Sequence, residues 1–94
     1  MSRGKTRAPS QRQLRVGETL RHALAEILER ESLQDPALSG VTLTITEVDA
    51  SPDLKQATVY VTRLGGGDMT GVLAGLGRVK SFLKRETAQR VRLR

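Results

Sequence analysis

The stretch that decides the fold is Val41-Thr-Leu-Thr-Ile-Thr-Glu-Val48, near the middle of a chain of 94 residues. Aliphatic side chains alternate with threonines in its first six residues, and a period of two places these sets on opposite faces of a β-strand. A second stretch, Ala57-Thr-Val-Tyr-Val61, repeats the alternation after the turn-forming residues Ser51-Pro-Asp-Leu54. The two stretches predict an antiparallel hairpin with one buried face.

A long amphipathic helix is predicted on the N-terminal side of this hairpin. Ser10 and Gln13 have the spacing of a capping box, in which two side chains satisfy free backbone N–H groups at a helix start. Apolar residues then recur at intervals of three and four and mark one buried stripe: Val16, Leu20, Ala23, Leu24, Ile27 and Leu28. The helix is predicted to end near Glu31, because Asp35-Pro36 and Ser39-Gly40 are turn signals.

Helical spacing returns on the C-terminal side of the hairpin. Gly65-Gly-Gly-Asp68 is interpreted as a flexible joint with Asp68 as the helix N-cap, because it lacks the glycine-to-lysine spacing of a phosphate-binding loop. Apolar residues then resume helical spacing at Val72, Leu76, Val79 and Leu83. Glycines within this region indicate a bend.

The end of the chain is predicted to return to the sheet. Val91 and Leu93 alternate with arginines, as in a short strand. The predicted element order is therefore α-β-β-α-α-β. This is an α+β class in which the helices cover one face of a three-stranded sheet.

Charge is distributed unevenly along the chain, although the net charge is only +6. Residues 1–15 hold five basic side chains and no acid, residues 16–77 hold four against nine acids, and residues 78–94 hold seven against one. Two basic ends around an acidic middle predict contact with nucleic acid, with membrane surfaces and acidic proteins as alternative partners. Residues 1–9 are expected to be a flexible basic tail, and residues 10–94 a single domain.

Several functional classes find no support in the sequence. The chain has no cysteine, which excludes disulfides and thiolate metal sites and suits a reducing cytoplasm. No apolar run could cross a membrane, and no signal peptide is visible, so a soluble cytoplasmic protein is expected. His22 is the only histidine, and Asp49 and Asp53 flank a turn, so no metal, cofactor or catalytic centre is expected.

Several segments, taken together in their order and spacing, resemble the bacterial ribosome-binding factor A family. The segments are Arg15-Val16, Asp35-Pro-Ala-Leu38, the three hairpin stretches quoted above, Phe82-Leu-Lys-Arg-Glu86 and Arg92-Leu-Arg94. The resemblance implies a type II KH-like fold and a non-enzymatic factor that binds the small (30S) ribosomal subunit and its 16S rRNA. It further implies a role in late maturation, in processing of the 5′ end of 16S rRNA, and in growth in the cold.

The chain departs from the KH pattern in the region between its last two helices. Ordinary KH domains clamp nucleic acid with a Gly-x-x-Gly loop, and this spacing occurs nowhere in the chain. The family instead has an Ala-x-Gly kink, which by resemblance falls on Val79-Lys80-Ser81, where both marker residues are replaced. Gly75 and Gly77 are alternative positions for the bend. The family also commonly carries a few more residues after its final strand.

Basic residues on and near the last helix are the candidate rRNA contacts, because a helical wheel separates several of them from the apolar stripe. With two arginines of the first helix, the candidates are Arg78, Lys80, Lys84, Arg85, Arg90, Arg92, Arg94, Arg12 and Arg15. A second contact zone is expected at Arg12, Arg15, Arg3, Lys5 and Arg7. Tyr60 is the one candidate for base stacking, although cross-strand packing explains it better.

The predicted function is therefore that of a ribosome assembly factor that recognises folded rRNA through shape and phosphates. It is expected to be a monomer away from the ribosome, with no small-molecule substrate and no membrane partner. The alternative is a general KH-like protein that binds free RNA or DNA.

Overall fold

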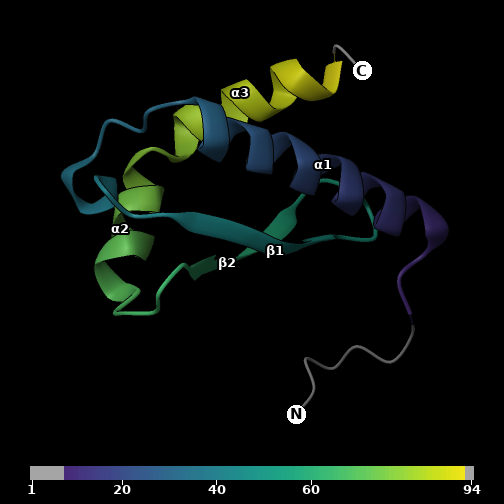
Figure 1. Ribbon diagram of the computed structural model, residues 1–94. Coiled ribbons are helices and arrows are strands. Elements are labelled where there is room, and N and C mark those ends of the chain that lie inside the picture. The colour runs from purple at the N-terminus through teal and green to yellow at the C-terminus, as the bar shows by residue number, and fades with distance from the viewer. Residues whose placement is uncertain (1–7, 93–94) are drawn as a thin grey trace.

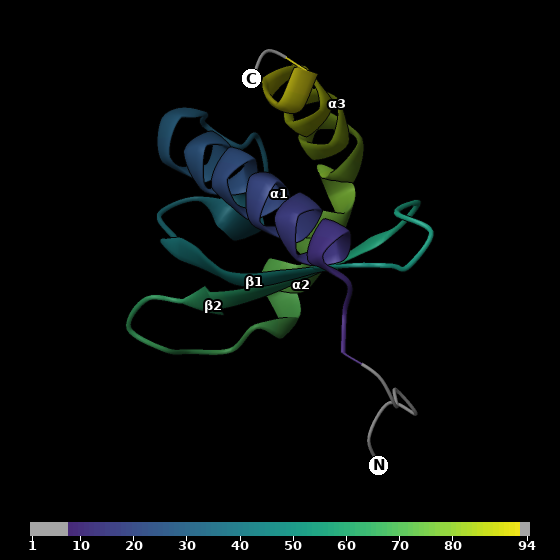
Figure 2. The ribbon, with the colours of Figure 1, turned by 90° about the vertical axis from the view of Figure 1, so that its right-hand side faces the viewer.

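The computed structural model describes residues 8–92, which form three α-helices, a short 3-10 helix and a two-stranded antiparallel sheet. In chain order the elements are α1 (Gln11–Arg30), η1 (Pro36–Leu38), β1 (Leu43–Ala50), β2 (Ala57–Arg63), α2 (Thr70–Arg78) and α3 (Lys80–Arg92). Helix α1 crosses one face of the sheet, α3 packs on α1, and α2 lies at one end of the sheet (Figures 1 and 2). The predicted mixture of helices and strands is confirmed.

The capping box predicted at the start of α1 is present. The backbone N–H of Gln13 donates to Ser10 Oγ at 3.1 Å, and the backbone N–H of Ser10 donates to Gln13 Oε1 at 2.9 Å. The Gln13 side chain also donates to the backbone oxygen of Ala50 at 3.0 Å. The same residue therefore caps the helix and ties it to the end of β1.

The hydrophobic core lies between α1 and the sheet. Its buried cluster consists of Leu24, Ile27, Ile45 and Val48. Partly buried side chains surround this cluster: Leu20, Leu28, Val61, Phe82 and Leu83. The predicted stripe of α1 thus faces the predicted strand, and α3 contributes only Phe82 and Leu83 to the core.

Strand β1 does not keep the strict alternation of its sequence. A β-bulge lies between Ile45 and Glu47 and leaves Thr46 as the extra residue. This insertion shifts the alternation by one position, so Val48 joins Ile45 on the buried face. The strand also begins at Leu43, two residues later than the alternation predicts.

Helix α2 begins later than the sequence predicts. Met69, and not Asp68, occupies the N-cap position, and the helix starts at Thr70. The Asp68 carboxylate still accepts a hydrogen bond from the backbone N–H of Thr70 at 3.2 Å. This bond holds the pKa of Asp68 below its usual value.

Glycine at position 17 allows α1 to approach β1 closely. A Cβ atom added to Gly17 would lie 2.4 Å from the backbone oxygen of Val48, and Gly17 itself is buried. Gly17 belongs to the backbone of α1 and the Val48 oxygen to the backbone of β1, so neither group can move away easily. The sequence alone does not distinguish this residue, because one glycine inside a helical pattern gives no sign of its neighbours.

Helix α2 is joined to η1 by close packing and by an ion pair. A Cβ atom at Gly75 would lie 2.9 Å from Asp35 Oδ1 and 3.1 Å from Leu38 Cγ, so a larger residue would require these side chains to shift. Arg78 Nε lies 2.7 Å from Asp35 Oδ2, and Arg78 Nη2 lies 3.0 Å from Asp35 Oδ1. The Asp35 side chain is only 5% exposed, so this two-point pairing satisfies a buried carboxylate.

The strand expected at the end of the chain is not present at Val91. Val91 lies in α3, and the sheet formed by residues 8–92 has two strands. A helix is favoured here because Glu86 and Arg90 stand one helical turn apart and pair at 3.0 Å. Two alternating apolar residues favour a strand too weakly to outweigh this pairing. The other residues of the expected strand, Leu93 and Arg94, lie outside the described residues.

The first prediction concerns the contact between α1 and β1. We expect Gly17→Ala to lower the free energy of unfolding by about 1–3 kcal/mol or more, because its methyl group would overlap backbone atoms of β1. Gly71→Ala is the matched control, because nothing lies within 4 Å of a Cβ added there. Ala is the better helix former, so this control should stabilise the protein by up to about 1 kcal/mol. Urea unfolding of both variants measures the difference, and equal stabilities would contradict the close approach.

The second prediction concerns the pH dependence of stability. Hydrogen bonds from Arg78 hold the pKa of Asp35 below its usual value, although burial acts in the opposite direction. The stabilisation by Asp35 is therefore complete above its unfolded-state pKa of about 4 and is lost as pH falls through the lower folded-state pKa. We expect Asp35→Asn to lower the melting temperature at pH 7. In acid, the difference in melting temperature between this variant and the wild type should become smaller. Glu29→Gln, at an exposed position of α1, should show no such difference, and a pH-independent difference for Asp35→Asn would contradict the prediction.

Candidate nucleic-acid interface

Helix α3 presents a basic outer face. Phe82 and Leu83 turn toward the core, and Glu86, the one acid of this helix, is turned toward Arg90 and is largely buried. The exposed residues of its other side are Ser81, Lys84, Arg85, Ala88, Gln89 and Arg92. We refer to Lys84, Arg85 and Arg92 as the α3 cationic stripe, because they lie on one exposed side of the helix without an acid among them.

The α3 cationic stripe has its charges available for a partner. Among residues 8–92, no carboxylate forms an ion pair with any of its three side chains. The guanidinium carbon of Arg85 lies 5.9 Å from the centroid of the Phe82 ring, which restricts the Arg85 side chain without neutralising it. An exposed row of unneutralised cations is suited to phosphate groups.

Arg78 differs from the stripe, because Asp35 already neutralises its charge. Their hydrogen bonds raise the pKa of Arg78, and the Arg78 side chain remains 57% exposed along its length. In the sequence, Asp35 stands out only as part of a turn signal, because its partner Arg78 lies 43 residues away. No local pattern could have paired them.

Arg90 is also engaged within the protein. Its side chain is 21% exposed and lies near three carboxylates. The Nη1 atom lies 3.0 Å from Glu86 Oε1, Nη2 lies 3.4 Å from Glu31 Oε2, and Nε lies 3.6 Å from Glu26 Oε1. We refer to these four residues as the Arg90 cluster.

The break between α2 and α3 falls at Val79. This residue has φ −102° and ψ 15°, α2 ends at Arg78, and α3 begins at Lys80. The alternative bend positions, Gly75 and Gly77, both lie inside α2. Lys80 and Ser81 are exposed at the start of α3.

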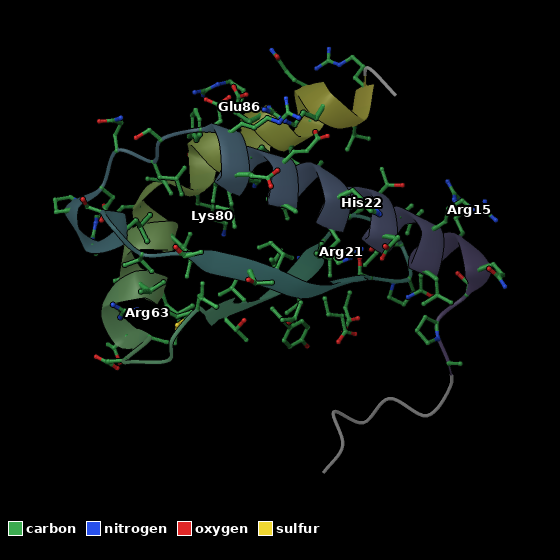
Figure 3. All side chains as sticks on the ribbon, viewed as in Figure 1. Arg15, Arg21, His22, Arg63, Lys80 and Glu86 are labelled. Carbon is green, nitrogen blue, oxygen red and sulfur yellow. The ribbon has the colours of Figure 1, made fainter. Side chains whose placement is uncertain are left out.

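The candidate arginines of α1 are remote from this break. Arg12 and Arg15 are exposed, and Figure 3 shows Arg15 near the N-terminal end of α1, at the opposite end of the molecule from Lys80. The structure therefore does not bring Arg15 to the start of α3. Arg3, Lys5, Arg7 and Arg94 lie outside the described residues.

Tyr60 lies on the face of the sheet that is turned away from α1. It stands opposite Glu47 in the strand register and is 37% exposed, and its backbone oxygen accepts a hydrogen bond from Thr46 at 3.2 Å. No second aromatic side chain occurs in β1 or β2, so this face lacks the aromatic platform typical of single-strand binding.

The other polar residues considered in the sequence form local contacts. His22 lies 3.1 Å from Glu18, which also pairs with Arg21 on the same helix (Figure 3 labels His22 and Arg21). The Asp53 carboxylate accepts hydrogen bonds from Ser51 Oγ and from the backbone N–H of Lys55, which lower the pKa of Asp53. Each of these contacts is explained by local structure.

Metal-binding clusters and membrane-spanning helices are absent from the described part of the chain. Residues 8–92 contain no group of three or more His, Cys, Asp or Glu side chains with an arrangement that could hold a metal ion. None of the described helices combines the length and the apolar character that a membrane span requires.

Comparison with known proteins places the chain in a family. The family model of ribosome-binding factor A matches residues 12–94. Proteins with that name from Rhodospirillum rubrum and Paramagnetospirillum magneticum are each 57% identical to this chain, over 91 and 94 residues. The matches cover 97% and 100% of this chain, but only 56% and 66% of those relatives.

A third relative gives the same result. The ribosome-binding factor A of Methylocella silvestris is 56% identical over 86 residues, which is 92% of this chain and 56% of that protein. The chain thus spans little more than half to two thirds of the length of these relatives. From the family match and these identities, we conclude that the chain belongs to the ribosome-binding factor A family.

Proposed function

We propose that this protein is a non-enzymatic assembly factor that binds the small (30S) ribosomal subunit and contacts phosphates of its 16S rRNA. The names of the relatives describe ribosome-binding factors, which supports a ribosomal partner. The role extends to late maturation of the subunit, to processing of the 5′ end of 16S rRNA and to growth in the cold. Its setting is the cytoplasm, where the ribosome is assembled.

The α3 cationic stripe is the observation that carries this proposal. Lys84, Arg85 and Arg92 are exposed, and no ion pair within residues 8–92 neutralises them. The apolar residues of the same helix are turned toward the core, so the helix has one side for folding and one for a polyanion. Binding of such cations to phosphates releases counterions and weakens as salt concentration rises.

Recognition is proposed to depend on rRNA shape and phosphate positions. The hairpin offers a single exposed aromatic ring, which is too little for stacking along a single strand. Folded RNA offers phosphates at fixed spacings, and the rigid axis of a helix can match them. The protein would act stoichiometrically, because a factor that binds one rRNA conformation more tightly than another shifts the population toward it.

We also propose that the domain has the KH-like topology, with a third strand on the free edge of β1. An open groove runs along this edge between the C-terminal half of α1 and the beginning of β1, and residues from the intervening loop line it. Unpaired backbone groups at a strand edge can accept another strand.

The third prediction tests the rRNA contact. We expect Lys84→Glu with Arg85→Glu to weaken binding to purified small subunits at least about tenfold, because two attractive charges become repulsive. Co-sedimentation at several salt concentrations measures this effect, and wild-type binding should itself be lost at high salt. The melting temperature should change little, because both side chains are exposed.

A matched control uses another lysine. Lys84→Glu and Lys55→Glu change the net charge equally at exposed positions, but Lys55 lies in the turn between β1 and β2 and not on α3. Only Lys84→Glu should weaken binding. Equal effects of both changes, or equal wild-type affinity for unrelated short RNAs and for subunits, would contradict the proposed function.

A further inference from the structure

The last two turns of α3 have an unusual attachment to the rest of the protein. The apolar contacts of α3 with the core come from Phe82 and Leu83, both in its first turn. No residue of α3 is fully buried. Beyond the first turn, the partly buried side chains are chiefly polar: Glu86, Thr87, Arg90 and Val91. Hydrophobic burial therefore holds the start of α3 but contributes little to its C-terminal half.

The Arg90 cluster supplies an attachment for that half. Glu26 belongs to α1, Glu31 follows its last residue, and Glu86 stands one turn before Arg90 on α3. The guanidinium thus bridges two elements that lie far apart in the sequence. Figures 1 and 2 show α3 beside α1 on the side away from the sheet, so the sheet does not support this half of the helix.

Arginine is well suited to this position. Its planar guanidinium presents several N–H donors in fixed directions, and three of its nitrogens lie near three different carboxylates. A lysine ammonium at the same position would be a compact charge that cannot match this fork. The cluster also contains more negative than positive charge, so its guanidinium is fully neutralised.

We propose that Arg90 is a positioning residue, which fixes the C-terminal half of α3 on α1 and so presents the α3 cationic stripe as one rigid surface. This inference rests on the proposed function, because the stripe is the surface that meets rRNA phosphates. It gives Arg90 a different role from the neighbouring Arg85 and Arg92. Arg90 itself makes no phosphate contact.

The geometry separates these two roles. A phosphate that reached Arg90 would have to displace carboxylates at 3.0–3.6 Å and approach the negative charges of Glu26, Glu31 and Glu86. Arg85 and Arg92 are exposed and carry no such neighbours among residues 8–92. Rigid presentation matters because any motion of the helix end must be frozen when the stripe binds, which weakens the affinity.

The experiment compares substitutions that keep the charge. Arg90→Lys and Arg30→Lys both preserve the net charge, and their affinities for purified small subunits are measured at several salt concentrations at 10 °C. Hydrogen exchange of the α3 amides is followed in the free proteins. We expect Arg90→Lys to speed exchange in the last two turns of α3 and to weaken binding several-fold, whereas Arg30→Lys, at an exposed position of α1 outside the stripe, should do neither.

The salt dependence distinguishes positioning from contact. Arg85→Gln should reduce the slope of log K against log salt by about 0.7–0.9, the value of one phosphate contact. Arg90→Lys should weaken binding while leaving this slope unchanged, since the same cations still meet the phosphates. If Arg90→Lys keeps wild-type affinity and exchange, while Arg90→Gln reduces the slope as Arg85→Gln does, the inference is overturned.

A second variant tests the cluster from its acidic side. Glu31→Gln makes the protein more positive, so general electrostatic attraction predicts tighter binding to RNA. Positioning predicts weaker binding and faster exchange in α3, because Arg90 loses a partner. Glu29→Gln is the matched control, with the same charge change at an exposed site on α1, and it should not loosen α3.

The two proposals fail in different ways. If the wild-type protein does not bind small subunits, the proposed function is wrong and the presentation role of Arg90 falls with it. Hydrogen exchange still decides whether Arg90 holds α3 on α1. If the wild-type protein binds but Glu31→Gln tightens binding as Glu29→Gln does, only the positioning role is overturned.

Discussion

The packing of α1 against β1 is the constraint on which the rest of the structure depends. The helix approaches the strand so closely at Gly17 that a Cβ atom there would overlap the backbone oxygen of Val48. This approach brings Leu24 and Ile27 of α1 into contact with Ile45 and Val48 of β1, which together form the buried cluster. Since α3 rests mainly on α1, the position of its basic side is set indirectly by this contact.

Arginine has two separate uses in this protein. Arg78 and Arg90 pair with carboxylates distant in the sequence and join helices to the rest of the chain. The arginines of the α3 cationic stripe have no such partners among the described residues and remain available to an anion. A count of basic residues does not distinguish these uses. The two kinds of arginine differ in the carboxylates around them.

The sequence predicted the features that depend on local spacing. The capping box at Ser10 and Gln13 and the buried stripe of α1 were both found as predicted, because each follows from helical geometry alone. The bulge at Thr46 was missed, because an inserted residue leaves the alternation of the preceding side chains unchanged. The strand predicted at Val91 is wrong. Two alternating apolar residues are weak evidence for a strand, and the pairing of Glu86 with Arg90 favours a helix there.

Long-range pairs were beyond the reach of local patterns. The partner of Arg78 lies 43 residues away, and that of Arg90 at Glu31 lies 59 residues away. Such pairs depend on how the helices pack against one another, and a short stretch of sequence carries no information about this packing. The composition of α3 therefore correctly predicts that the helix is basic. It does not predict which of the cations of α3 are already neutralised by carboxylates.

The bulge at Thr46 has a consequence for the behaviour of the protein in a crowded solution. A two-stranded sheet has two free edges, and long flat edges tend to pair with other chains and aggregate. The bulge interrupts the edge of β1 partway along and increases its local twist, so an incoming strand from a second molecule would find only a short stretch in register. The same inserted residue that returns Val48 to the core thus also shortens the regular edge that β1 offers to a strand of another molecule.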